Sequence, residues 1–276
     1  MSRNVTIALA QTDSVLGDVT ASCAKAEALI RKAASQGAQI VCLPELCTTG
    51  YRQDLLGDKL WELAEPVEPT PGPTVTHFSS LAKELGLYII LPMIEQGTMP
   101  GIVHNSAVFI NKNGTVQGVF RKVHAFATER YYFTDGNSYP VFETEFGKVG
   151  IMICYDMGFP EVARVLTLQG AEIIFAPSAW CQEDEDVWDI NIPARALENR
   201  VFLAAVNRVG SEEDLVMHGK SKVVDTRGRT LVEAARFQED LVCATVDLNT
   251  LRQARHQTPY LKDRKPHTYE LITKCL

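Results

Sequence analysis

Three reactive side chains follow segments that read as β-strands. Glu45 ends the segment 40–45, Lys122 ends 116–122 and Cys154 ends 149–154. A cysteine sulfur can attack an acyl carbon, a carboxylate can accept the thiol proton, and an ammonium group can stabilise the resulting oxyanion. Taken singly, each residue has an ordinary interpretation as a buried thiol, a surface acid or a solvated strand-end lysine. Their combination indicates nucleophilic catalysis by a cysteine.

The sequence around each residue refines this interpretation. Cys154 precedes a turn, after which Pro160 and Glu161 suit the first turn of a helix. A thiol in a strand-to-helix turn points toward the open end of the sheet, where backbone N–H groups can donate to an oxyanion. We expect the Lys122 ammonium to lower the pKa of the Cys154 thiol. Glu129, seven residues after Lys122, is expected to hold the lysine in place.

The sequence also repeats part of itself. The segment 37–45, GAQIVCLPE, resembles 170–178, GAEIIFAPS, and each follows an apolar strand and a helix-like stretch. Two further matches share one offset, and they pair 84–91 with 198–205 and 104–114 with 218–228. Each half therefore reads strand, helix, strand, helix, strand, hairpin, strand.

Two such halves, each with helices on one face of a sheet, can bury their bare sheet faces against each other. The pattern predicts an α/β fold, a four-layer α-β-β-α sandwich with an internal pseudo-two-fold repeat, formed as a single domain over 1–276. Residues that differ between the halves are not needed for the shared packing. Glu45 aligns with Ser178 and Cys154 with Ala10, so the acid and the thiol are additions to the scaffold.

The composition argues against several other classes. The chain has 27 Lys and Arg against 34 Asp and Glu, a net charge of −7, and no basic cluster for nucleic acid. No apolar run reaches the ~18 residues of a membrane helix. Seven scattered cysteines without a Cys-x-x-Cys pair favour reduced thiols in a cytoplasm. The six histidines form no ligand pair, and no phosphate loop or dinucleotide fingerprint occurs, so neither a metal nor a cofactor is expected.

The motifs at the three reactive residues read LPE at 43–45, RKVH at 121–124 and ICYD at 153–156. In this order they resemble the nitrilase superfamily of carbon–nitrogen hydrolases, whose second glutamate corresponds to Glu129. Further similar stretches run to DRKP at 263–266, so the resemblance spans nearly the whole chain. It implies an α-β-β-α sandwich, in agreement with the repeat.

The residues after the cysteine indicate which branch of the superfamily the chain resembles. Nitrilases usually have Cys-Trp-Glu, whereas this chain has Cys-Tyr-Asp at 154–156, as amidase and carbamoylase branches do. The ω-amidase branch typically carries an arginine where this chain has Gly158, which argues against acidic monoamides of dicarboxylates. The stretch 122–161 is more similar to aliphatic amidases.

The resemblance implies that Glu45 is the base, Cys154 the nucleophile, and Lys122 with the backbone N–H of Tyr155 the oxyanion site. Loops near Cys154 supply candidate substrate-binding aromatics, namely Tyr51, Phe126, Tyr155 and Trp180. Asp156 is expected to form a structural ion pair with Arg195 or Arg200.

The sequence therefore predicts an amidase that converts a small linear amide to a carboxylic acid and ammonia. Three alternatives stay open: an N-carbamoyl amine or amino acid amidohydrolase with the same triad, a nitrilase, and a non-catalytic binding protein on the same scaffold. The expected partner is a small molecule rather than nucleic acid or a membrane. The resemblance also implies a homodimer or a larger even assembly, to which the polar tail 251–276 contributes.

Overall fold

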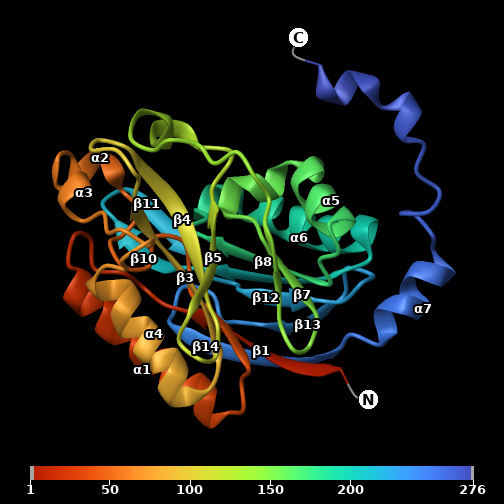
Figure 1. Cartoon of the computed structure of the whole chain (residues 1–276), viewed down its shortest axis with the longest axis horizontal. Helices are drawn as coiled ribbons and strands as arrows, with labels where there is room; N and C mark the ends of the chain where they lie inside the picture. The colour runs from red at the N-terminus through yellow and green to blue at the C-terminus, as the bar shows by residue number, and fades with distance from the viewer. Residues whose placement is uncertain (1–2, 275–276) are drawn as a thin grey trace.

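The computed structural model describes residues 3–274, which form two β-sheets packed face to face between two layers of helices (Figure 1). The first sheet has the order β14-β1-β2-β3-β4-β5. Its strands are β1 (Asn4–Gln11), β2 (Ile40–Cys42), β3 (Tyr88–Gln96), β4 (Val103–Ile110), β5 (Val116–Arg121) and β14 (Asp240–Asp247). The second sheet has the order β13-β12-β9-β8-β7-β6. Its strands are β6 (Val141–Glu143), β7 (Lys148–Ile151), β8 (Ile173–Ser178), β9 (Phe202–Asn207), β12 (Lys222–Val224) and β13 (Thr230–Glu233).

Helices cover the outer face of each sheet. The first sheet is covered by α1 (Val19–Ser35) and α4 (Pro73–Leu85), and the second by α5 (Pro160–Leu168) and α6 (Glu185–Asn199) (Figure 1). Each covering helix buries one face; in α1 this face consists of Ser22, Ala26, Ile30 and Ala33, at the spacing of a helical repeat. The predicted α-β-β-α sandwich is confirmed.

Shorter elements lie around this frame. The helices α2 (Gln53–Leu56) and α3 (Lys59–Glu62) and the hairpin β10 (Val209–Glu212) with β11 (Leu215–His218) lie at one end of the sandwich (Figure 1). After β14, α7 (Thr250–Gln257) leads into a largely exposed segment that runs along the outside of the molecule. Among the helices of residues 3–274, none combines the length and apolar character that a membrane span requires.

The core between the sheets consists of aliphatic and aromatic side chains. Ile7 and Phe109 from the first sheet and Ile151, Phe175 and Leu203 from the second belong to one fully buried cluster. The parallel strands β1 to β3 and β7 to β9 are covered on both faces, which explains their continuous Val- and Ile-rich runs.

The strand register supports the repeat seen in the sequence. Ile40 pairs with Tyr88 in the first sheet, and Ile173 pairs with Phe202 at the matching place in the second. Leu91 pairs with Val108 in the first sheet, and Ala205 pairs with Lys222 in the second. The offset between these two pairs is the one that relates 84–91 to 198–205 in the sequence.

The alignment of the first strand of each half was wrong by two residues. Val149 occupies the place of Ile7 beside the next parallel strand, so Cys154 corresponds to Thr12 rather than to Ala10. Both segments are apolar throughout, and a slip of two residues keeps every side chain on its own face of the sheet. The pattern alone therefore could not fix the register.

Candidate active site

Glu45, Lys122 and Glu129 meet in one buried ion cluster. The Lys122 ammonium donates to Glu45 Oε1 and to Glu129 Oε1, each at 2.7 Å. Lys122 comes directly after β5, and Glu45 lies shortly after the parallel strand β2, so both lie at the carboxyl end of the first sheet. All three side chains are almost completely buried. Two carboxylates thus share one ammonium in a site that excludes bulk water.

Glu45 is held by three donors. Besides Lys122, Oε1 accepts a hydrogen bond from Asn105 Nδ2 at 2.8 Å, and Oε2 accepts one from the backbone N–H of Ala179 at 2.9 Å. Neither Asn105 nor Ala179 was predicted from the sequence. A polar amide inside the apolar strand β4 was a signal for Asn105, because buried amides need partners. No signal marked Ala179, since its backbone is the contributing group.

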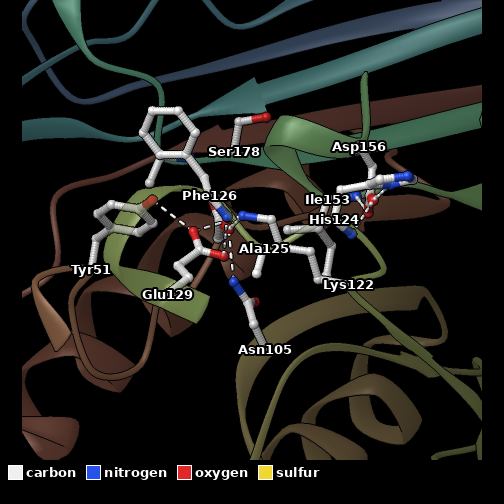
Figure 2. Close-up of polar contacts among 12 residues, drawn as sticks. Tyr51, Asn105, Lys122, His124, Ala125, Phe126, Glu129, Ile153, Asp156 and Ser178 are labelled. Atoms are coloured by element: carbon white, nitrogen blue, oxygen red, sulfur yellow. Dashed lines mark hydrogen bonds and ion pairs between the residues drawn. The ribbon is translucent and has the colours of Figure 1, made fainter. Parts of the chain in front are cut away.

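Glu129 is fixed from the other side by Tyr51 (Figure 2). The Tyr51 hydroxyl donates to Glu129 Oε1 at 2.6 Å. Burial raises the pKa of Glu129 against the opposing effect of Lys122, and the nearby Glu45 charge adds to the rise. For Lys122, burial alone would lower the pKa, but the charges of Glu129 and Glu45 outweigh burial, and the net shift is upward. The lysine therefore stays an ammonium.

A second acid fixes the loop that carries Tyr51. Glu212, at the end of β10, accepts hydrogen bonds from the backbone N–H groups of Tyr51 and Arg52 at 3.1 and 2.8 Å. The fully buried Arg208 holds Glu212 with an ion pair of 2.5 Å. The second half of the chain thus positions a residue that contacts the ion cluster of the first half.

Cys154 lies in a 3₁₀ turn, Cys154–Gly158, between β7 and α5. Its φ of 48° is in the left-handed region, which costs a non-glycine residue on the order of 1 kcal/mol. Asp156 holds this turn, since Oδ2 accepts the Ile153 N–H at 3.1 Å and Oδ1 accepts His124 Nδ1 at 2.7 Å (Figure 2).

The expected partners of Asp156 were therefore wrong. Arg195 instead donates to the Met157 carbonyl and pairs with Glu198, whereas Arg200 donates to the carbonyl of Thr226. His124 follows Lys122 by two residues, so Asp156 ties the strand end bearing the lysine to the turn bearing Cys154.

Lys122 has the expected lowering effect on the pKa of Cys154, but other effects outweigh it. Burial raises the pKa of this thiol well above its usual value, the Glu45 charge raises it further, and Lys122 only partly opposes them. The sequence indicated that Lys122 lies near the thiol, but it did not show how deeply the thiol is buried. Cys154 is therefore a neutral thiol at neutral pH, and it needs a base to become a nucleophile.

Cys154 opens into a cavity of about 260 Å³. Its lining residues are Phe126, Cys154, Tyr155, Gly158, Ala179, Trp180, Cys181, Asp184, Val187 and Asn191. Three of the four expected wall aromatics, Phe126, Tyr155 and Trp180, line it. Tyr51 does not; its hydroxyl donates to Glu129, and its backbone N–H donates to Glu212. Within residues 3–274, no group of His, Cys, Asp and Glu has the arrangement of a metal site.

The fold and this site define a carbon–nitrogen hydrolase. The family model of that description matches residues 6–256, so the chain belongs to the carbon–nitrogen hydrolase family, as the resemblance to the nitrilase superfamily led us to expect. A nitrilase of Pyrococcus abyssi is 34% identical and covers 96% of this chain and 99% of its own length. An N-carbamoylputrescine amidase of Solanum lycopersicum is 32% identical over 98% of this chain and 95% of its own. The crystal structure of a Helicobacter pylori carbon–nitrogen hydrolase has a TM-score of 0.92 at 29% identity, over 99% of both chains.

Replacing Lys122 by methionine should destabilise the fold in a pH-dependent way. The substitution leaves two buried carboxylates without a counterion, which costs about 3–5 kcal/mol at pH 7. Without the ammonium, which opposes the effect of burial, the folded-state pKa of Glu129 rises further above its unfolded value. The part of the penalty that belongs to Glu129 is then full above this raised pKa and is lost as the pH falls and the carboxylate takes up a proton. Urea unfolding at pH 7 and pH 5 measures this difference.

The matched control is Lys112→Met, which removes a surface pair with Glu145 and should cost under about 1 kcal/mol at either pH. An equal loss for Lys122→Met at both pH values would contradict the account of the ion cluster.

Alkylation of Cys154 by iodoacetamide should accelerate with pH through pH 9 and beyond, because only the thiolate reacts and burial raises its pKa. Glu45→Gln removes a charge that raises this pKa, so its rate profile should shift to lower pH. Mass spectrometry of the Cys154 peptide separates this rate from those of the other thiols. The control is Glu95→Gln, a buried acid paired with Arg121. A rate plateau around pH 7 in the unmodified protein would refute the raised pKa.

Proposed function

We propose that the protein is an amidase that hydrolyses a small linear amide to a carboxylic acid and ammonia through a thioester on Cys154. The observation that carries the proposal is the buried cluster of Glu45, Lys122 and Glu129 beside a thiol that opens into a cavity. Membership of the carbon–nitrogen hydrolase family agrees with this chemistry.

In the first half-reaction, Glu45 takes the proton of the Cys154 thiol while the sulfur attacks the amide carbon. Three donors hold the Glu45 carboxylate, so no reorganisation is needed as it acts. The protonated Glu45 then gives its proton to the departing nitrogen. The C–N bond breaks, ammonia leaves, and the acyl group stays on sulfur as a thioester.

The oxyanion formed in each half-reaction is held by Lys122 and the backbone N–H of Tyr155. An ammonium group has three N–H donors, of which Lys122 uses two on Glu45 and Glu129. The third is available to a substrate oxygen. Glu129 and Tyr51 keep the ammonium in place, so the donor is oriented before the charge develops.

In the second half-reaction, water attacks the thioester with Glu45 again as the base. The carboxylic acid leaves, and the proton returns to the Cys154 sulfur. The cavity of about 260 Å³, with its walls of Phe126, Tyr155 and Trp180, suits a short unbranched acyl chain.

The second candidate is hydrolysis of an N-carbamoyl amine, in which the same groups attack a ureido carbon. It is favoured by the similarity to the tomato N-carbamoylputrescine amidase along nearly the whole chain. Because the chain is also similar to a nitrilase from Pyrococcus abyssi, nitriles are included among the substrates to be tested.

A panel of simple amides, carbamoyl amines and nitriles, assayed for ammonia release, tests these assignments. Amides should be hydrolysed best, and Cys154→Ala should lower kcat by at least roughly a thousandfold, because the nucleophile is lost. Cys243→Ala, which removes a thiol in β14, is the matched control. Release from carbamoyl compounds alone would transfer the function to the second candidate. No release from any compound would leave a binding protein on an enzyme scaffold.

We further propose that residues 1–276 act as one domain within a cytoplasmic homodimer or larger even assembly, with the tail 251–276 contributing to the interface. Leu271 and Ile272 support this, because they are 73% and 61% exposed on a segment that packs little on its own chain. Sedimentation at micromolar concentration should give a dimer or a multiple of it. A stable monomer would refute the proposal.

A further inference from the structure

We infer that the substrate carries a positively charged group at the end remote from the scissile bond, and that Asp184 binds this group. The inference rests on the proposed function, because it takes the cavity at Cys154 as the substrate site.

Asp184 is the one charged side chain among the ten residues that line the cavity. No lysine, arginine or histidine belongs to the lining. The other polar groups of the lining side chains are the Asn191 amide, the Tyr155 hydroxyl and the thiols of Cys154 and Cys181. A cavity with one acid and no base favours a cationic ligand over an anionic one.

The Asp184 carboxylate has no cation among residues 3–274. It occupies the N-cap position of α6, yet its side chain accepts no hydrogen bond from the helix. The contact found for it is the Cys181 thiol, at 3.7 Å from Oδ2. The next residue, Glu185, is instead paired with Lys220 and Arg236. The chain thus neutralises the neighbouring acid and leaves Asp184, one of the residues that line the cavity, without a cation among the described residues.

The backbone at Asp184 is nevertheless fixed. The Trp180 indole N–H donates to the Asp184 carbonyl at 2.9 Å, and the Trp180 backbone N–H donates to Asn207 Oδ1 at 2.7 Å. The carboxylate is therefore carried by an ordered turn that also forms part of the cavity wall. A fixed charge recognises a ligand at a smaller entropic cost than a mobile one.

The remaining walls suit an alkyl chain with a cationic end. Phe126, Tyr155 and Trp180 offer aromatic faces, which attract ammonium groups, and Val187 adds an aliphatic surface. A Cβ atom at Gly158 would meet nothing within 4 Å, so the missing side chain leaves space and supplies no partner for a substrate carboxylate. Cys154 and Asp184 line the same cavity, so one linear molecule can reach both. The substrate class is a linear amide or urea with a terminal ammonium group.

The test compares three amides of equal chain length that differ in the end group: 5-aminopentanamide, hexanamide and adipic acid monoamide. The ureas (4-aminobutyl)urea, pentylurea and 5-ureidopentanoate form a parallel set. The ammonium member should have the highest kcat/KM in the set that is hydrolysed, and the carboxylate member the lowest. Asp184→Asn should lower the ratio of kcat/KM between the ammonium and neutral members by roughly tenfold to a hundredfold, mainly through KM. Asp186→Asn, which removes an exposed acid two residues further along the chain, should leave this ratio unchanged.

A measurement on the unmodified protein covers the case in which Asp184→Asn fails to fold. Pentylamine should inhibit competitively at lower concentration than pentanol, because only the amine is charged. Equal inhibition, or hydrolysis of the neutral member as efficient as that of the ammonium member, overturns the inference and leaves the proposed function intact. Failure to hydrolyse any member of either set, together with no turnover of the wider panel, overturns both.

Discussion

The site depends on an imbalance of charge: one ammonium serves two buried carboxylates. Lys122 bonds both Glu45 and Glu129 at the same distance, so neither acid can be moved without changing the other. Burying this cluster is unfavourable in isolation, and hydrogen bonds to its carboxylates from Asn105, Ala179 and Tyr51 offset part of this cost. The surrounding structure supplies these donors from three separate segments of the chain. The sandwich fold therefore brings these donors together around the ion cluster.

The two halves of the repeat contribute unequally to this arrangement. The first half supplies Glu45, Lys122 and Glu129, whereas the second supplies Cys154 and the carboxyl-terminal end of β8, where the Ala179 N–H lies. Glu212 also belongs to the second half, yet it fixes the loop of Tyr51 in the first. Neither half holds a complete set of reacting groups. The reaction therefore depends on the packing of the two sheets against each other.

Much of this could be predicted from the sequence because it depends on order along the chain. Strand ends locate Glu45, Lys122 and Cys154, and the constant offset between the halves predicts the sandwich. The failures concern properties that arise only when distant segments pack. The pKa of Cys154 follows from its burial, the partner of Asp156 is a histidine rather than either expected arginine, and Tyr51 faces an acid rather than the cavity. Asp184 carries no sequence motif, and its position on the cavity wall appears only in three dimensions.

The neutral resting state of Cys154 has a consequence for the durability of the protein. Peroxides and disulfides react with thiolates, and they react far more slowly with protonated thiols. A nucleophile that is buried and protonated until a substrate aligns with Glu45 is thus shielded from the oxidants of its surroundings. In such a site the sulfur is not permanently activated, but it resists oxidation. Burial, together with the nearby charges of Glu45 and Glu129, therefore protects the sulfur from oxidation between turnovers.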